Sequence, residues 1–452
     1  MSSTLIALPL SNGESFLLRT KDNDGREWTI LVDSGKKYGK NTRELAQKLS
    51  EVSPSVKHID IAICTHSDAD HSQGFWYFAD DWYGMGRTIG EYWLPGRWAN
   101  AFPKIITDPT GFVANLANGA LEASEDFRGQ SKSMEFGSRE AIYSMASKAL
   151  LEDEAGAAVV AIDEHASEDG ELSAFGLTAE EAFEIRLGLE EADDTVDPLE
   201  AAISQITASS PWSPQAFYLF ETSKSIGSFL EGNAAFLEVA ETAKAIDKIA
   251  RSAIAHNIQV RWFDFGEYMK TDTPKGGIPG LLEPCCAVEV MPDRNKAMAL
   301  SNVALFHSLR LTRQNVESLV FYRPETDSDP GVLFLGDSRL AHGINKPGKD
   351  FPLPFEKPSR KVLVTAPHHG SRNNDHAFTV LDTWLGSTDQ FFVRNGGQSG
   401  QKLDRFLEYD ERRCAQCFQC HGTDWNQWVA IMTDGNNWKW PPNSERCGKP
   451  KQ

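Results

Sequence analysis

Short apolar runs alternate with polar turns over the first 65 residues of the chain. Residues 4–10, 15–20, 27–35 and 58–65 are such runs, and runs of this length and composition predict β-strands. The stretch 43–52, between the last two runs, has its apolar residues at helical spacing and predicts a helix. A strand, a helix and a further strand in this order favour an α/β layer architecture.

Strand-like runs return after residue 258. They are residues 259–265, 286–292, 318–324, 331–339, 361–371 and 428–435. The stretches between the two sets of strands are rich in Ala and Glu with helical apolar spacing, and lie at 138–156, 177–194 and 225–257. The pattern predicts an α/β domain in two halves, residues 1–97 and 258–452, separated by a helical insertion at 98–257.

Negative charge is concentrated in the predicted insertion. The formal net charge is -19, and residues 149–223 carry -17 of it, with eighteen Asp and Glu side chains against one basic residue, Arg186. The rest of the chain is nearly neutral, which neither supports nor excludes a phosphate-rich substrate. We expect the acidic helix faces to be solvated. The alternatives are that the insertion contacts a partner protein or covers a site.

Two histidines and two aspartates follow directly after the predicted strand 58–65. They are His66, Asp68, Asp70 and His71, in the stretch THSDADH. Loops at strand ends present side chains to clefts, and imidazole and carboxylate groups are the usual ligands of Zn²⁺, Mn²⁺ and Fe. Four such groups so close together can be divided between two ions. A polar loop with capping aspartates is the simpler interpretation of the same residues.

Other predicted strands also end in ligand-type residues. Asp33 ends EWTILVD, Asp337 ends GVLFLGD, and His368 and His369 end VLVTAPHH. One polar strand end is common, but several that end in such residues indicate one shared site. The carboxylate of Asp337 is a candidate bridge between two metal ions.

These motifs resemble those of the metallo-β-lactamase superfamily of hydrolases. The stretch HSDADH is similar to the family's HxHxDH signature, with Asp in place of the second His. Further similar stretches are DSG at Asp33, LFLGD at Asp337 and APHHGS at His369. The combination of HxDxDH with HHGS resembles the metallo-hydrolase domain of bacterial DNA-uptake competence proteins and phosphorylcholine-esterase-like relatives. The resemblance covers residues 1–95 and 258–440.

The resemblance implies a four-layer αβ/βα sandwich with two divalent metal ions, zinc or manganese, at one edge. The implied ligands form two sets that share one aspartate: His66, Asp68 and Asp337, and Asp70, His71, Asp337 and His369. Asp68 makes the first set richer in oxygen than a three-histidine site, which favours Mn²⁺ or Mg²⁺, with Zn²⁺ the alternative. The family's third-motif histidine has no clear match. Asn315 and His307 are the candidates, and a lone histidine such as His307 is more often a core residue.

The resemblance also implies supporting roles. Asp33 would orient the ligands from behind. Asp70, or alternatively Asp68, would accept a proton from the attacking water. His369 is the favoured ligand of the histidine pair because it precedes the glycine. His368 would then contact the substrate or assist proton transfer.

The predicted activity is hydrolysis by a water molecule that two metal ions activate, with a phosphodiester, such as nucleic acid, as substrate. Ser371 and Arg372 would bind a phosphoryl oxygen, although Arg372 reads equally as an exposed loop residue. One alternative is hydrolysis of a small-molecule ester, lactone or thioester, because fold and ligands do not settle the substrate. Another is a non-catalytic metal-binding scaffold that acts through its acidic helices.

The remaining sequence features concern cysteines and location. Cys414, Cys417 and Cys420, with His421 or Cys447, have spacing that suits a structural zinc site, and unligated thiols are the alternative. No apolar run is long enough to span a membrane, and the first residues lack the basic and apolar regions of a secretory signal. We therefore expect a cytoplasmic protein that does not contact membranes.

Overall fold

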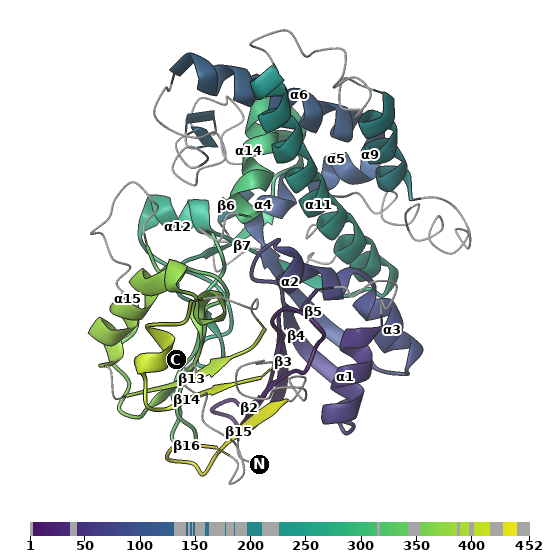
Figure 1. Ribbon diagram of the computed structural model, residues 1–452. Coiled ribbons are helices and arrows are strands. Elements are labelled where there is room, and N and C mark those ends of the chain that lie inside the picture. Colours follow the sequence, from purple (N-terminus) through teal and green to yellow (C-terminus); the bar gives the residue numbers. More distant parts are fainter. Residues whose placement is uncertain are drawn as a thin grey trace.

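The computed structural model contains two β-sheets and a group of helices (Figure 1). Isolated positions between 142 and 185 are described, and otherwise the structure describes residues 3–36, 43–130, 197–209, 226–313, 317–341, 353–386, 389–396, 402–415 and 428–440.

The first sheet has ten strands in the order β16-β15-β1-β2-β3-β4-β5-β7-β9-β6. In chain order they are β1 (Thr4–Ala7), β2 (Phe16–Lys21), β3 (Glu27–Val32), β4 (His58–Ile63), β5 (Thr88–Pro95), β6 (Val159–Ala161), β7 (Gln259–Asp264), β9 (Val288–Pro292), β15 (Val429–Thr433) and β16 (Trp438–Lys439). Strands β3, β4, β5 and β7 are parallel to one another, and the flanking pairs are antiparallel.

The second sheet has six strands in the order β14-β13-β12-β11-β10-β8. They are β8 (Glu283–Pro284), β10 (Phe321–Arg323), β11 (Val332–Phe334), β12 (Val362–Thr365), β13 (Gln390–Arg394) and β14 (Arg412–Cys414). Strands β11 to β14 are parallel, and β10 is antiparallel to both of its neighbours. The central strands β11 and β12 are fully buried, and their sequences, VLF and VLVT, are short apolar runs.

The inner faces of the two sheets share one hydrophobic cluster. Phe16, Ile63 and Trp93 from the first sheet join Phe321 and Val393 from the second. The ring of Trp93 lies 5.3 Å from that of Phe321, centroid to centroid, so aromatic side chains cross directly between the sheets. The chain therefore has the predicted mixed α/β architecture.

Helices cover the outer faces of the sheets. Leu45 and Leu49 of α1 belong to the same buried cluster as Leu31 of β3, and the Phe378 ring of α15 lies 5.4 Å from Phe392 of β13. The helices beside the sheets are α1 (Glu44–Val52), α2 (Ala69–Ser72), α3 (Phe78–Gly84), α4 (Gly96–Ala99), α12 (Phe265–Thr271), α13 (Arg294–Ala299), α15 (Asp375–Leu385) and the 3₁₀ turns η1 (Gln73–Tyr77), η3 (Pro367–Gly370), η4 (Arg372–Asn374) and η5 (Phe406–Glu408).

A group of longer helices, which we call the helical lobe, lies at the top of the view in Figure 1. Its members are α5 (Phe102–Thr107), α6 (Pro109–Gln130), α9 (Pro198–Ser209), α11 (Ile226–Ala255) and α14 (Asn302–Arg313). Helix α6 packs on each of the other four, and α11 also packs on α14. The predicted insertion, residues 98–257, does not coincide with the lobe. Helix α14 of the lobe comes from residues after the insertion, and β6 of the insertion belongs to the first sheet.

Most of the predicted elements are confirmed within the described residues. The runs that start at residues 4, 15, 27, 58, 259, 286, 318, 331, 361 and 428 all contain strands, and 43–52 and 225–257 contain α1 and α11. The sequence analysis did not identify β5, β13, α14 or α15. The predicted helices at 138–156 and 177–194 lie largely outside the described residues. Over the described residues, no helix is both long and apolar enough to cross a membrane.

Candidate metal centre

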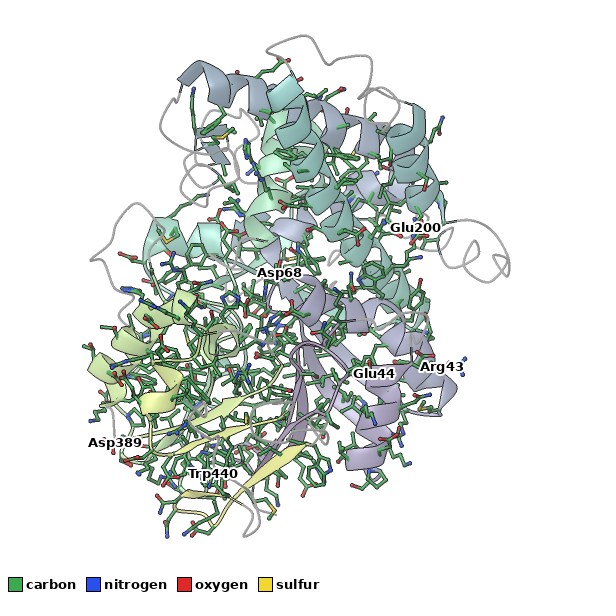
Figure 2. The ribbon with its side chains drawn as sticks, viewed as in Figure 1. Arg43, Glu44, Asp68, Glu200, Asp389 and Trp440 are labelled. Atoms are coloured by element: carbon green, nitrogen blue, oxygen red, sulfur yellow. The ribbon has the colours of Figure 1, made fainter. Side chains whose placement is uncertain are left out.

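The stretch from His66 to His71 lies where the chain leaves β4. Asp68 has extended backbone angles and caps the short helix α2, which carries Asp70 and His71. Both histidine side chains are completely buried, whereas that of Asp68 is 27% exposed. Asp68 lies where the helical lobe meets the two sheets (Figure 2).

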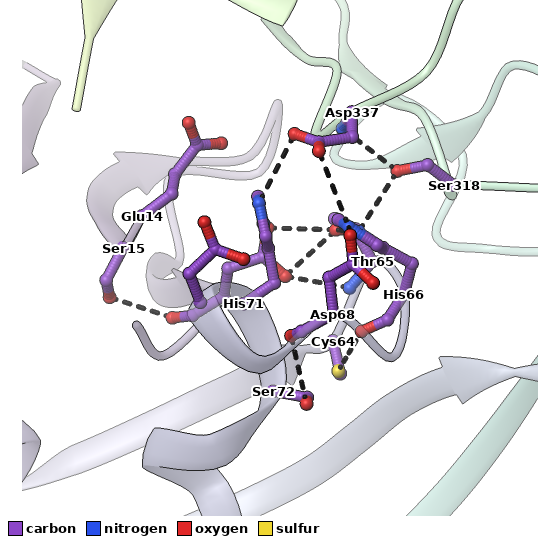
Figure 3. Close-up of polar contacts among 12 residues, drawn as sticks. Glu14, Ser15, Cys64, Thr65, His66, Asp68, His71, Ser72, Ser318 and Asp337 are labelled. Atoms are coloured by element: carbon purple, nitrogen blue, oxygen red, sulfur yellow. Dashed lines mark hydrogen bonds and ion pairs between the residues drawn. The ribbon is translucent and has the colours of Figure 1, made fainter. Parts of the chain in front are cut away.

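Asp337 reaches the two histidines from the second sheet (Figure 3). Its Oδ2 lies 3.7 Å from Nε2 of His66, and its Oδ1 lies 3.3 Å from Nε2 of His71. Its backbone N–H donates to Ser318 Oγ at 3.1 Å, and its carbonyl accepts from Asn374 Nδ2 at 2.8 Å. Asp337 is therefore held between the histidines with one carboxylate oxygen toward each.

The two late histidines approach from the turn after β12. Nε2 of His369 lies 3.1 Å from Oδ2 of Asp70, and Nε2 of His368 lies 3.6 Å from Oδ2 of Asp337. Both histidines have left-handed backbones, with φ of 49° and 52°, and Gly370 follows with φ of 77°. Two successive non-glycine residues in this region are uncommon, and such conformations concentrate at functional sites.

The hydrogen bonds behind three histidines assign the same tautomer to each. The carboxylate of Asp33 accepts from His71 Nδ1 at 2.8 Å. Thr65 Oγ1 donates to Asp33 at 2.9 Å, so it accepts from His66 Nδ1, also at 2.9 Å. The carbonyl of Asn395 accepts from His369 Nδ1 at 2.8 Å. With Nδ1 bound behind each ring, Nε2 is the nitrogen that faces Asp337 or Asp70, and it becomes a ligand atom when its proton is lost to an incoming metal ion.

The local field is set by clustered carboxylates. Burial opposes the charged form of His71, but Asp337 and Asp33 outweigh it and raise the pKa of His71 well above its ordinary value. For His369 burial again opposes the charged form, and the hydrogen bond to Asp70 helps to raise its pKa to about 10. By contrast, burial and then His71 lower the pKa of His66 to about 3. The site thus favours positive charge on His71 and His369 but not on His66.

The residues fit divalent metal ions. Nε2 of His66 and Nε2 of His71 are buried and make no hydrogen bond, which is uncommon for buried polar atoms. Two groups place one ligand atom per residue within 4.8 Å of one another: His66, His71 and Asp337, and Asp70, His71 and His369. This mixture of nitrogen and oxygen donors suits Zn²⁺ or Mn²⁺.

The helical lobe contacts the stretch that carries the first candidate ligands. Ser67, between His66 and Asp68, accepts a hydrogen bond from Thr242 Oγ1 of α11 at 3.2 Å, and both Ser67 and Thr242 are buried. Helix α11 also packs along η1, which follows α2. The predicted insertion therefore supports the backbone that carries the first two candidate ligands.

Two predicted substrate-binding residues have other contacts. Ser371 is 5% exposed, and its Oγ caps η4 by accepting from the backbone N–H of Asn373 at 3.3 Å. The side chain of Arg372 is exposed and pairs with Asp404 at 3.8 Å. Their contact with a phosphoryl oxygen stays a prediction.

Other predicted candidates lie apart from the cluster. His307 is buried in α14 beside Phe306, where burial lowers its pKa to about 3, and it belongs to none of the metal-compatible groups. Cys414 is buried in β14. The remaining candidates lie outside the described residues: Asn315, Cys417, Cys420, His421 and Cys447.

The sequence analysis missed several residues around the cluster. Glu14 is 1% exposed, its Oε2 lies 3.4 Å from Nδ1 of His369, and burial raises its pKa to about 7. It forms a third metal-compatible group with Asp33 and His71. A glutamate just before a strand reads as a surface residue, so only its position in the fold reveals it. Thr65 could have been identified from the sequence, because it lies directly before His66.

Comparisons of the sequence with models of known protein families and with curated proteins found no match. Four histidines and three aspartates from the ends of β4, β11 and β12 meet at one edge of the two sheets.

Proposed function

We propose that this chain is a metal-dependent hydrolase of the metallo-β-lactamase type that uses two divalent ions to cleave a phosphodiester. The proposal includes the αβ/βα sandwich fold. Two sheets that share one core, with α1 and α15 on their outer faces, support that arrangement.

One observation carries the proposal. The carboxylate of Asp337 lies between His66 and His71, one oxygen toward each, and both facing Nε2 atoms are buried without a hydrogen bond. A core built only for stability would satisfy these atoms. The arrangement suits an aspartate that bridges two ions.

We assign the candidate ligands to two sets that share Asp337. His66, Asp68 and one oxygen of Asp337 would hold the first ion. The second would be held by the other oxygen of Asp337 together with Asp70, His71 and His369. When bound, the two ions would lower the pKa of a water molecule and offset negative charge that develops on the scissile group.

The chain's own groups would then position ligands and move protons. Asp33 holds His71 directly and His66 through Thr65, so it orients ligands of both sets. The side chain of Asp70 is 34% exposed, which lets it take a proton from an attacking water. The side chain of His368 is 21% exposed, and it would contact the substrate or transfer a proton to the leaving group.

The test combines metal analysis with two chromogenic substrates. Purified wild type and Asp337→Asn would be assayed for bound metal and for hydrolysis of bis-p-nitrophenyl phosphate and p-nitrophenyl acetate, with Mn²⁺ or Zn²⁺ added. We expect two ions per chain and phosphodiester hydrolysis in the wild type, and loss of both in the variant. Turnover of the acetate alone would instead indicate an ester hydrolase, and bound metal without hydrolysis would indicate a scaffold.

A further inference from the structure

Asn395 links the late histidine to a loop of the first sheet. It follows β13 directly and is completely buried. Its carbonyl accepts from Nδ1 of His369, and its side-chain Nδ2 donates to the carbonyls of Leu8 and Ser15, at 3.1 Å and 2.7 Å. One residue of the second sheet therefore contacts both a candidate ligand and the loop between β1 and β2.

That loop, residues 8–15, is built against the backbone of the candidate ligands. The N–H of Glu14 donates to the carbonyl of Asp70 at 2.9 Å, and Ser15 Oγ donates to the carbonyl of Asp33 at 2.8 Å. A Cβ on Gly13 would lie only 2.2 Å from the carbonyl oxygen of Asp70. Because the backbones touch, a shift of the loop displaces Asp70.

The backbone after β13 also lies against the loop 8–15. A Cβ on Gly396, next to Asn395, would lie 2.6 Å from the carbonyl oxygen of Gly13. Close backbone contacts therefore run from Gly396 through Gly13 to Asp70, beside the hydrogen bonds that Asn395 makes to Leu8 and Ser15. Glycine is required at positive φ here, and both Gly13 and Gly396 have it, at 89° and 68°.

We propose that Asn395 is a positioning residue for the second ion of the proposed centre. It keeps the His369 ring in the tautomer that presents Nε2, and it holds the loop 8–15 where Asp70 meets that nitrogen. The inference depends on the proposed two-metal function. The first set is oriented by other residues, with Thr65 and Ser318 against its ligands. Loss of Asn395 should therefore affect the second ion more than the first.

The chain offers a matched control on the same strand. Gln390 begins β13 at the end away from Asn395 and is 2% exposed. Its Nε2 also donates two hydrogen bonds, to Asp382 Oδ1 and to the carbonyl of Gly386, both at 3.0 Å. Asn395→Leu and Gln390→Met each remove a buried amide that donates twice, but only the amide of Asn395 holds the loop 8–15, whose backbone contacts Asp70.

The experiment measures metal per chain after dialysis against buffered Zn²⁺, together with melting temperature by circular dichroism. We expect two ions in the wild type and in Gln390→Met, and one ion in Asn395→Leu, with similar melting temperatures for the two variants. Affinity for the second ion should fall about 10- to 100-fold, the usual effect of losing a group that orients a ligand. Asn395→Asp, which keeps the shape but replaces the donor by an acceptor, should show the same loss and serves if the leucine variant does not fold.

The outcomes separate the two proposals. Two tightly bound ions in Asn395→Leu or Asn395→Asp would overturn the role of Asn395 while leaving the metal centre intact. Loss of an ion in Gln390→Met as well would also overturn it, because general destabilisation would then explain the result. A wild-type chain that binds no metal would overturn the proposed function, and this inference with it.

Discussion

Replacement of Asp33 by asparagine should weaken metal binding at the proposed centre without unfolding the chain. Asp33 is completely buried and has a left-handed backbone with φ of 58°, a conformation that asparagine tolerates better than most residues. Its Oδ1 accepts from the backbone N–H of Thr65 at 2.8 Å, and an asparagine oxygen can keep that bond. The amide nitrogen must then face Nδ1 of His71.

That contact reverses the tautomer of His71. An amide N–H would donate to Nδ1, so the ring proton would move to Nε2, which lies 3.3 Å from Oδ1 of Asp337. A protonated Nε2 cannot bind a metal. A hydrogen bond to a charged acceptor contributes about 1.5–3 kcal/mol. Since 1.4 kcal/mol is tenfold in affinity, metal binding should weaken by about 10- to 100-fold.

The assay is competition for Zn²⁺ with a chromophoric chelator, with chemical denaturation as a second measurement. Asp329→Asn is the matched control because Asp329 is also buried and accepts a hydrogen bond from Ser3 Oγ at 2.6 Å, yet belongs to none of the metal-compatible groups. It should lose stability and keep its affinity for Zn²⁺. If Asp33→Asn bound Zn²⁺ as tightly as the wild type, the tautomer argument would be refuted.

Three further predictions concern stability. Burial raises the pKa of Asp247 to about 6, so this carboxyl opposes folding once it is ionised. Asp247→Asn should therefore raise the free energy of unfolding, by an amount that grows between about pH 4 and pH 6, reaches roughly 3 kcal/mol and then stays constant. Chemical denaturation at several pH values measures this. Gly13→Ala should lower the melting temperature far more than Gly25→Ala. Both glycines have positive φ, but a Cβ would meet backbone atoms only at Gly13. Equal effects of the two substitutions would contradict this. Arg97→Met should cost about 3–5 kcal/mol by leaving Glu317 buried without its charged partner, and the double variant with Glu317→Leu should recover much of that loss in urea denaturation.

The predicted strands were found where burial on both faces leaves a continuous apolar run, as at 58–65 and 361–371. Helix α14 was missed because it buries polar residues that read as surface. His307 and Arg310 are 1% and 2% exposed there, which no local pattern indicates. Packing against α6 and α11, and not the spacing of apolar residues in α14 alone, decides this part of the fold.

The candidate ligands could be predicted because their chemistry is in their side chains and their position is at strand ends. Asp33, which orients His71 directly and His66 through Thr65, could be predicted in the same way, but Asn395 and Glu14 could not. Asn395 acts on His369 through a backbone carbonyl, which every residue has, and Glu14 becomes a neighbour of His369 only when the two sheets meet. Roles of this kind depend on tertiary contacts between segments separated by hundreds of residues.

Because the candidate ligands lie on two different sheets, metal binding at the proposed centre would be coupled to the stability of the folded chain. An ion that needs Asp337 from one sheet and His66 or His71 from the other binds only after the sheets have docked. Binding to the native state alone adds about 2.7 kcal/mol of stability when the free ion is at 100 times its dissociation constant. Metal starvation would then shift newly made chains toward the unfolded, protease-sensitive population, so the abundance of the protein would follow the availability of its ion.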